Sequence, residues 1–298
     1  MAAVEIRRLI NRFQPDIINP HYAAGYGFSA ALANIGKRVP IVLNLWGGDI
    51  LLAPKKSFLH KMKPSLALKA ADCVVGDSQY LLMAAEKLSR LRVKQVIPWG
   101  IEKRYLAFHK QSYQFQKPLR IIVPRRHEKL YNNPFIVQSL APLIREGKIE
   151  ITFPDYGDLI TDFRQETNRL VGNRVRFYNR KPRQEFLSFM AEHDLYLSAS
   201  TTDSSPASLI EAMGLGLLPV VANIPGVREW LNPESGYLFR QNDPEDLKNL
   251  ITTLLKKQDP HEQMRKNNLA RVKREATFEE NIAEQLTIMK RLAEGKHT

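Results

Sequence analysis

The chain has 298 residues, of which 44% are hydrophobic and 25% are charged, and this composition excludes a disordered or fibrous protein. It contains 44 Lys and Arg against 31 Asp and Glu, a formal net charge of +13. A single cysteine, Cys73, excludes an intrachain disulfide framework. The sequence shows neither an apolar run of about 18 residues nor a secretory signal pattern. We therefore expect a cytoplasmic protein of roughly two domains.

Short apolar runs rich in β-branched residues alternate with amphipathic stretches along the chain. The runs predicted as buried parallel strands are 16–19, 40–45, 73–75, 95–97, 120–123, 150–153, 175–178, 195–198 and 218–222. The helices predicted between them include 28–35, 134–145, 159–170, 183–193 and 206–215. This alternation predicts an α/β protein with parallel sheets.

The polar stretch 102–118 lacks periodicity and precedes a new strand, so we place a domain boundary there. We expect an N-terminal domain over residues 1–110 and a C-terminal domain over residues 118–275. The remaining residues, 276–298, are expected to form a helix that packs back on the N-terminal domain.

The positive charge is concentrated in the first part of the chain. Residues 1–120 carry 19 Lys and Arg against 7 Asp and Glu, a net charge of +12, whereas the remaining residues carry 25 and 24. The densest basic run is interleaved with apolar residues and contains Lys55, Lys56, Lys61, Lys63 and Lys69. A solvated helix face and a surface that meets anionic lipid headgroups both fit this pattern. Nucleic acid is disfavoured because no nucleic-acid motif accompanies the charge.

The most informative segment covers residues 199–221. It follows a predicted strand, passes through a small polar loop and opens a helix near Ser205 and Pro206, a typical helix start. The free N–H groups of that first turn favour anions, and α/β sheets place ligands at this end of their strands. Ser208 and Glu211 are three residues apart and share one helix face. By pattern alone, a solvated surface carboxylate is the favoured interpretation of Glu211.

The same segment resembles the donor-binding signature of the retaining glycosyltransferases of family 4, which have the GT-B fold. Their pattern is an acidic residue, seven residues, then Glu, followed by Ala-Met-x-x-Gly-x-Pro-Val-Val. This sequence has Asp203, seven residues and Glu211, and then Ala-Met, Gly216 and Pro-Val-Val at 219–221. The continuation Ile-Pro-Gly-Val-Arg-Glu-Trp at 224–230 is similar to one subgroup of the family.

Other segments resemble the same family, so the resemblance covers nearly the whole chain. Arg125, with Arg126 beside it, matches an Arg that contacts the donor's diphosphate, and Lys129 matches a Lys with the same role. His21 ends a segment similar to a strand whose terminal His faces the acceptor and the reacting sugar, although a lone His after a strand is more often structural. The segment 46–49, Trp-Gly-Gly-Asp, resembles an acceptor-side loop.

The resemblance implies two Rossmann-like domains facing across a cleft and a retaining hexosyltransferase. The enzyme would use a nucleotide-diphosphate sugar, a lipid-linked or polysaccharide acceptor, and neither metal nor cofactor. The catalytic residues would be Asp203, His21 and Arg125, and the acceptor side would include His21, Gly48 and Asp49. The donor-binding residues would be Arg125, Arg126, Lys129, Ser205, Pro206, Ala207, Ser208, Leu209 and Glu211.

The sequence departs from the family at its start, because the family has further strands before the part that this chain matches. The resemblance therefore implies an incomplete N-terminal domain. Three explanations stay open: a fragment of a longer product, a second chain that supplies the strands, or a protein that binds nucleotide sugar without catalysis. A nucleotide-sugar epimerase with the same fold is a further alternative, which the 203–221 signature disfavours. Peripheral attachment at the inner face of a membrane is expected from the basic N-terminal part.

Overall fold

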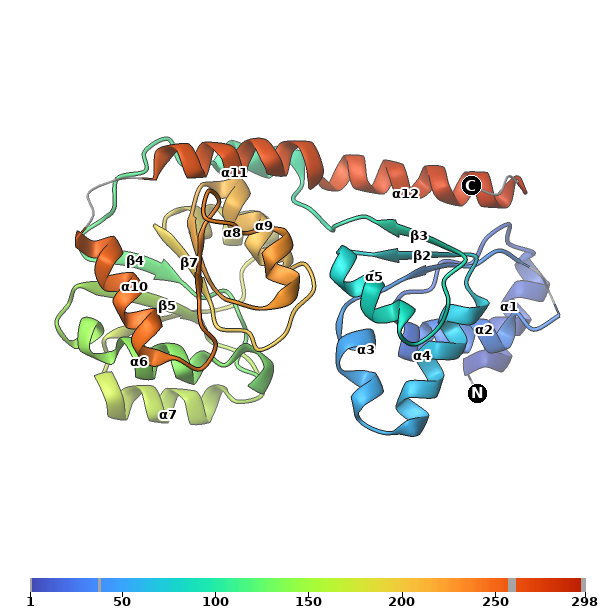
Figure 1. The fold of residues 1–298 in the computed structure, drawn as a ribbon, viewed down its shortest axis with the longest axis horizontal. Helices are drawn as coiled ribbons and strands as arrows, with labels where there is room; N and C mark the ends of the chain where they lie inside the picture. Colours follow the sequence, from blue (N-terminus) through green and yellow to red (C-terminus); the bar gives the residue numbers. More distant parts are fainter. Residues whose placement is uncertain (1, 37–38, 257–260, 296–298) are drawn as a thin grey trace. The chain divides into compact units, whose positions relative to one another are not determined.

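The structure is a computed structural model that describes residues 2–36, 39–256 and 261–295. The chain divides into two compact units, which are considered separately below (Figure 1). The first unit comprises Met1–Trp99, Asp203–Ser205 and Glu279–Thr298, and the second comprises Gly100–Thr202 and Pro206–Phe278. The last three residues of the helix expected at 276–298 lie outside the described residues.

The first unit contains a parallel three-stranded sheet in the order β1-β2-β3, with β1 (Val42–Asn44), β2 (Cys73–Gly76) and β3 (Val93–Val96). The strand predicted at 16–19 is not formed as a continuous strand. Ile18 and His21 instead make isolated parallel bridges to Ile41 and Asn44 and extend the sheet past β1. The helices of this unit are α1 (Ala2–Phe13), the π-helix η1 (Tyr22–Gly27), α2 (Phe28–Ala33), α3 (Gly48–Leu51), η2 (Ala53–Lys55), α4 (Phe58–Ala70), α5 (Gln79–Glu86) and α12 (Phe278–Ala293).

Helices cover both faces of this sheet. On one face, Leu43 packs in a buried cluster with side chains of α4 and α5. On the other face, Val42 and Cys73 pack with Ile288 of α12. The last helix in the sequence therefore supplies core side chains to the first unit, because the strands of a parallel sheet need apolar cover on both faces.

The second unit contains six parallel strands in the order β6-β5-β4-β7-β8-β9. The strands are β4 (Leu119–Ile122), β5 (Ile149–Pro154), β6 (Val175–Tyr178), β7 (Leu195–Ser198), β8 (Leu218–Ala222) and β9 (Tyr237–Phe239). The helices are η3 (Lys103–Phe108), η4 (Lys129–Tyr131), α6 (Asn133–Arg145), α7 (Ile160–Val171), α8 (Arg183–Ala191), α9 (Ala207–Leu215), η5 (Pro225–Glu229), α10 (Pro244–Lys256) and α11 (Glu262–Glu275). The bounds of β6, β7 and β8 agree with the prediction, whereas β9 was missed.

The strand order of the second unit is that of a doubly wound sheet. The chain starts in the middle with β4, proceeds outward through β5 and β6, and returns to the other side of β4 with β7. The loops that follow β4 and β7 therefore diverge at one point of the sheet edge, which is where ligands bind in such folds. Both units are layered around parallel sheets, and the predicted α/β fold class is confirmed.

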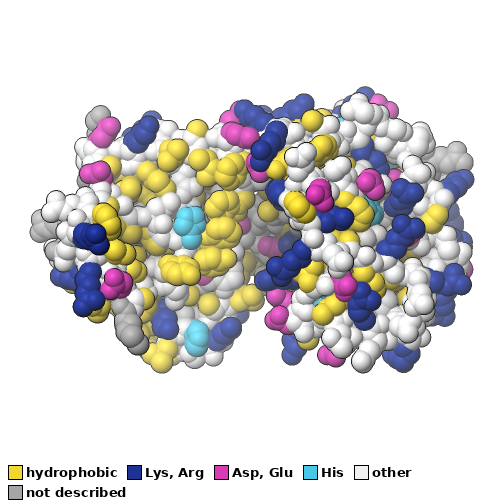
Figure 2. Space-filling model, turned by 180° about the vertical axis from the view of Figure 1, so that it is seen from behind, with side chains coloured by type: hydrophobic (Ala, Val, Ile, Leu, Met, Phe, Trp, Pro, Cys, Tyr) yellow, Lys and Arg dark blue, Asp and Glu magenta, His cyan; other side chains and the backbone are white. Residues whose placement is uncertain are grey.

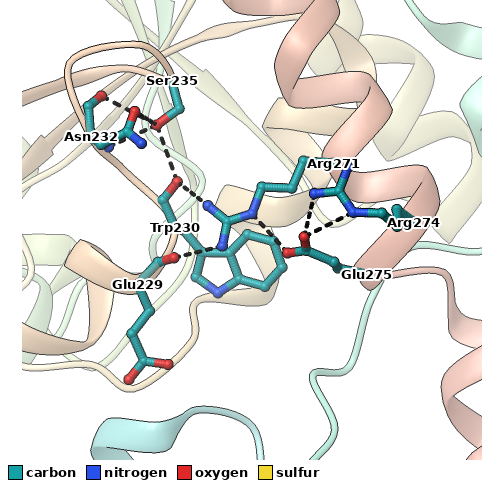
Figure 3. Close-up of polar contacts among 7 residues, drawn as sticks. All are labelled: Glu229, Trp230, Asn232, Ser235, Arg271, Arg274 and Glu275. Carbon is teal, nitrogen blue, oxygen red and sulfur yellow. Dashed lines mark hydrogen bonds and ion pairs between the residues drawn. The ribbon is translucent and has the colours of Figure 1, made fainter.

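The loop that follows β8 is fastened to the end of α11 (Figure 3). Arg271 donates hydrogen bonds from Nη2 to the Glu229 carbonyl at 2.7 Å and from Nη1 to the Trp230 carbonyl at 2.9 Å. Its guanidinium lies 4.7 Å from the centre of the Trp230 ring system, and its Nε pairs with Glu275 at 2.8 Å. One arginine therefore satisfies two loop carbonyls and packs against the indole, which fixes the path of the chain after η5.

Candidate functional site

The loop after β4 carries the basic residues that the sequence analysis assigns to the donor. Arg125 is half-buried, and its guanidinium lies 5.2 Å from the centre of the Tyr131 ring. Arg126 is exposed and pairs with Glu128 through a 2.7 Å contact. Lys129 is exposed at the start of η4. Of these basic side chains, Arg125 is the most enclosed by protein and so has the best fixed position.

The segment after β7 leads into α9, as predicted, but the helix starts one residue later. Pro206 is the N-cap, and it offers no side-chain cap, so the first N–H groups of α9 are not satisfied by a capping side chain. Ser208 is half-buried, and its hydroxyl lies 3.0 Å from the hydroxyl of Tyr196. The side chain of Leu209 is fully buried in the core, so any contact of Leu209 with a ligand would have to use its backbone.

Glu211 is not a solvated surface carboxylate. It is only 5% exposed, and its Oε1 accepts a 2.7 Å hydrogen bond from Nη1 of Arg183, the first residue of α8. Burial raises the pKa of Glu211, while the charges of Arg183 and Arg125 oppose that rise. The structure therefore places Arg125 and Glu211 within electrostatic reach of each other at the edge where β4 and β7 diverge.

The acceptor-side residues lie in the first unit, where parallel segments end. Nε1–H of Trp46 donates to Nδ1 of His21 at 3.0 Å, so the neutral ring of His21 carries its proton on Nε2. The rings of Trp46 and Trp99 stack at 4.4 Å, and Tyr22 stacks on Trp46 at 5.2 Å. Burial lowers the pKa of His21, which keeps the imidazole uncharged near neutral pH.

Asp49 is a structural carboxylate in this arrangement. It is buried, and its two oxygens accept backbone hydrogen bonds from Ala23 at 2.7 Å and Trp46 at 3.0 Å. These bonds tie the start of the π-helix to the loop after β1, and burial raises the pKa of Asp49 in spite of them. Gly48, by contrast, is exposed at the start of α3.

Asp77 follows β2 and was not singled out by the sequence analysis. Its oxygens accept hydrogen bonds from the hydroxyls of Ser204 at 2.7 Å and Ser78 at 3.1 Å, within the unit that contains Asp203–Ser205. Burial raises the pKa of Asp77 to about 7, and the charge of Asp203 adds to that rise. Gly47 approaches so closely that a Cβ there would lie 2.9 Å from the Ser204 hydroxyl. Asp77 therefore fixes the signature segment through Ser204, although no sequence pattern around Asp77 predicts this role.

The structure thus assigns the predicted residues to two groups, one in each unit. Arg125, Arg126, Lys129 and the residues from Pro206 to Glu211 lie in the second unit, at the switch point of its sheet. The first unit contains the acceptor-side residues together with Asp203 and Ser205. Four further residues, Arg183, Asp77, His127 and Asn133, were missed from the sequence. Arg183, Asp77 and His127 act through contacts that span 28, 127 and 27 residues, whereas Asn133 at the start of α6 contacts the nearby Arg125 loop without belonging to a motif. Among the described residues, no three His, Cys, Asp or Glu side chains gather as metal ligands would.

Comparison with known proteins gives matches over both parts of the chain. Residues 140–271 match the family model described as Glycosyl transferases group 1, and residues 1–78 match the one described as Glycosyl transferase 4-like. The chain is 24% identical over 272 residues to the putative teichuronic acid biosynthesis glycosyltransferase TuaC of Bacillus subtilis, covering 86% of this chain and 64% of that protein. It is 22% identical over 248 residues to the uncharacterised glycosyltransferase MJ1178 of Methanocaldococcus jannaschii, covering 82% and 66%. The chain therefore spans just under two thirds of the length of these relatives.

Solved structures with the same fold include the following two. HepE of Anabaena, in complex with UDP-glucose, aligns with a TM-score of 0.80 at 20% identity and covers 96% of this chain and 81% of its own. Sucrose-phosphate synthase of Thermosynechococcus elongatus aligns with a TM-score of 0.79 at 16% identity, covering 97% and 77%. In the described part of the chain, no helix has the length and apolarity needed to cross a bilayer. The chain is thus similar to glycosyltransferases in both of its parts, and its two Rossmann-like units have the GT-B fold.

Proposed function

We propose that the protein is a retaining glycosyltransferase that moves a hexose from a nucleotide-diphosphate sugar to a lipid-linked or polysaccharide acceptor without a metal. The observation that carries this proposal is the arrangement at the switch point of the second unit. There Arg125, the uncapped start of α9 and the buried Glu211 meet at the carboxyl ends of β4 and β7. Such an edge suits a nucleotide whose diphosphate is anionic and whose ribose offers hydroxyl groups.

The chemistry fits the charges present. Cleavage of the sugar–phosphate bond builds negative charge on the leaving diphosphate. Arg125 and Lys129 supply fixed positive charge, and the N–H groups of Ala207 and Ser208 supply dipoles, so the transition state gains more stabilisation than the ground state. These groups would do the work that a divalent cation does in other phosphate chemistry.

The carboxylates and the histidine have separate roles in this proposal. Glu211, whose charged form Arg183 favours, accepts hydrogen bonds from the ribose hydroxyls. Asp203 contacts hydroxyls of the transferred sugar and holds it in a reactive pose. His21, neutral and with its proton on Nε2, faces the acceptor side as a hydrogen-bond donor.

The relatives support the substrate classes. HepE was solved with UDP-glucose, and TuaC carries a name that refers to the synthesis of a polysaccharide. The alternative function is a partner-dependent or non-catalytic nucleotide-sugar-binding protein, which would bind the donor without turning it over.

The test is calorimetric titration with a panel of nucleoside diphosphates and their sugars, followed by an assay of sugar release and transfer. Binding of one nucleotide should be lost in Glu211→Ala and in Arg125→Ala, but kept in Glu234→Ala, which removes an exposed carboxylate of the same unit. Absence of binding to the folded wild-type chain, or binding that both variants leave intact, would refute the donor site. Donor binding without turnover would favour the alternative.

We also propose peripheral attachment to an anionic membrane, because apolar exposure is concentrated in the first unit. Among the described residues, all exposed large hydrophobic side chains except Phe278 belong to this unit, and Figure 2 shows many of them gathered on the face seen at its left. On α4, Phe58 and Leu59 are 79% and 61% exposed. From residue 50 to residue 71 the sequence has five lysines and no Asp or Glu. Exposed apolar side chains flanked only by cations suit an interface of anionic headgroups.

Vesicle sedimentation tests this attachment. Binding to vesicles with anionic lipid should fall with added salt and in the double variant Phe58→Ser/Leu59→Ser. Met83→Ser, which removes an apolar side chain that is 54% exposed on α5, should bind like wild type. Equal binding to neutral and anionic vesicles would contradict the proposal.

A further inference from the structure

A buried asparagine donates hydrogen bonds to the backbone of the loop that carries Arg125. Asn133, the first residue of α6, is 1% exposed. Its Nδ2 donates to the carbonyl of Arg125 at 2.8 Å, and the carbonyl of Arg126 lies 3.4 Å away. The same nitrogen lies 3.1 Å from Nδ1 of His127. The amide must present its nitrogen here, because the opposite orientation would place its oxygen against the two carbonyl oxygens.

The side chain of His127 completes the network and has a single tautomer that fits it. Nε2 lies 2.8 Å from the Pro154 carbonyl at the end of β5, so it must carry the proton and donate. Nδ1 is then unprotonated and accepts from Asn133. The ring is 2% exposed and stacks on Phe163 of α7 with centroids 4.1 Å apart. A neutral imidazole thus links the Arg125 loop to α6 through Asn133 and to β5 through Pro154.

The backbone of His127 is anchored as firmly as its ring. Its N–H donates to the Tyr156 carbonyl at 3.2 Å, and its carbonyl accepts from Leu159 at 2.9 Å. Gly157 has φ +129°, and a Cβ there would lie 2.2 Å from the His127 nitrogen, so glycine is required for this approach. The loop after β5 therefore packs backbone to backbone against the loop after β4.

We propose that Asn133 and His127 are positioning residues for Arg125: they hold its backbone so that the guanidinium points at the donor's diphosphate. This inference rests on the proposed function, since it assigns Arg125 to a diphosphate. Neither side chain would touch the donor. Their effect would be to remove the freedom of the loop, so that donor binding does not have to order it.

Protonation of His127 would break the network, because Nδ1–H would then face the Asn133 amide hydrogens. Burial lowers the pKa of His127, while the Pro154 carbonyl and the charge of Asp155 oppose that lowering and the charge of Arg164 adds to it. Arg164 and Asp155 pair with each other at 2.7 Å. The other charged groups around the ring are Glu128, Asp162 and Glu166. The neutral, linked form of His127 therefore prevails at neutral pH, and donor affinity should weaken as the pH falls through its lowered pKa.

Titration calorimetry with UDP-glucose tests the inference, because its diphosphate does not gain a proton in the range used, about pH 5 to 8. Asn133→Ala and His127→Phe should each raise the dissociation constant roughly tenfold, a typical effect of losing a supporting contact. His127→Phe keeps an aromatic ring against Phe163 and should make the weakening of binding at acid pH smaller. The part that remains is due to Glu211, whose pKa is raised by burial. The control is His193→Phe, a second buried histidine of this unit, hydrogen-bonded to Phe189 and Thr152, which should leave affinity unchanged.

Hydrogen exchange of the Arg126–Glu128 amides measures local opening of the loop without any ligand. It should be faster in Asn133→Ala than in the wild type. Wild-type affinity in both variants, or a weakening at acid pH that is as large in His127→Phe as in the wild type, would overturn the inference even though UDP-glucose binds. If the wild type binds neither UDP-glucose nor any other nucleotide of the panel while Arg126–Glu128 exchange accelerates in Asn133→Ala, the proposed function fails and the positioning of the loop stands. Unchanged exchange would overturn the positioning itself.

Discussion

Arg183→Ala should show how much the buried charge of Glu211 lowers the free energy of unfolding when it has no partner. Arg183→Ala deletes the guanidinium that donates to Glu211 at 2.7 Å and leaves a carboxylate whose side chain is 6% exposed. Breaking a fully buried ion pair costs about 3–5 kcal/mol. The side chain of Arg183 is 42% exposed, so solvent already screens part of this interaction. We therefore expect a loss of about 1–2 kcal/mol in the free energy of unfolding near neutral pH.

The dependence of this loss on pH identifies its cause. Burial raises the pKa of Glu211 above its ordinary value of 4.5, so the folded state holds the proton more tightly than the unfolded state does. The contribution of Glu211 to stability is then most favourable below the unfolded pKa, and it declines as the pH rises through the folded pKa. Without Arg183 the folded pKa rises further. The loss should therefore be larger at pH 8 than at pH 5.

Urea denaturation at both pH values, in wild-type and Glu211→Gln backgrounds, measures this coupling. In the Glu211→Gln background the cost of Arg183→Ala should shrink to less than about 0.5 kcal/mol, because no buried charge is left uncompensated. A cost that is equal at both pH values and equal in both backgrounds would refute the electrostatic account. It would then reflect lost packing of the arginine stem.

Three further predictions concern stability, and urea or thermal denaturation measures each. Asp77→Asn should raise the free energy of unfolding by about 1–2 kcal/mol at pH 8 but not at pH 4. The reason is that the raised pKa of about 7 makes the ionised carboxylate of the wild type unfavourable as the pH rises. Equal effects at both pH values would contradict this prediction. Gly157→Ala should lose at least about 2 kcal/mol, since neither its φ of +129° nor the 2.2 Å approach allows a Cβ. Arg271→Ala should lower the free energy of unfolding by about 1–2 kcal/mol, because two carbonyls lose their donor and Trp230 loses a packing partner. Arg274→Ala removes an exposed side chain and should lower it by less than about 0.5 kcal/mol. Equal losses would contradict the role given to the Arg271 contacts that Figure 3 shows.

Strands that are short runs rich in apolar residues could be predicted from the sequence. The strands β6, β7 and β8 follow the predicted bounds because each is a short apolar run between turn residues. The start of α9 was predicted to within one residue from Ser-Pro at 205–206. The strand expected at 16–19 formed only the isolated bridges of Ile18 and His21, although its residues have strand propensity. β9 was missed since Tyr237–Phe239 is too short to give a periodic signal.

The sequence by itself determined the α/β class and the signature that contains Asp203 and Glu211, since alternation and spacing are local properties. Only the tertiary structure decided what surrounds them. Arg183 meets Glu211 across 28 residues, and Ser204 meets Asp77 across 127. Burial at such contacts sets the charge states, because desolvation depends on every neighbour in space and not on neighbours in sequence. The same reason explains why His127, without any motif, emerges as the residue that holds the Arg125 loop.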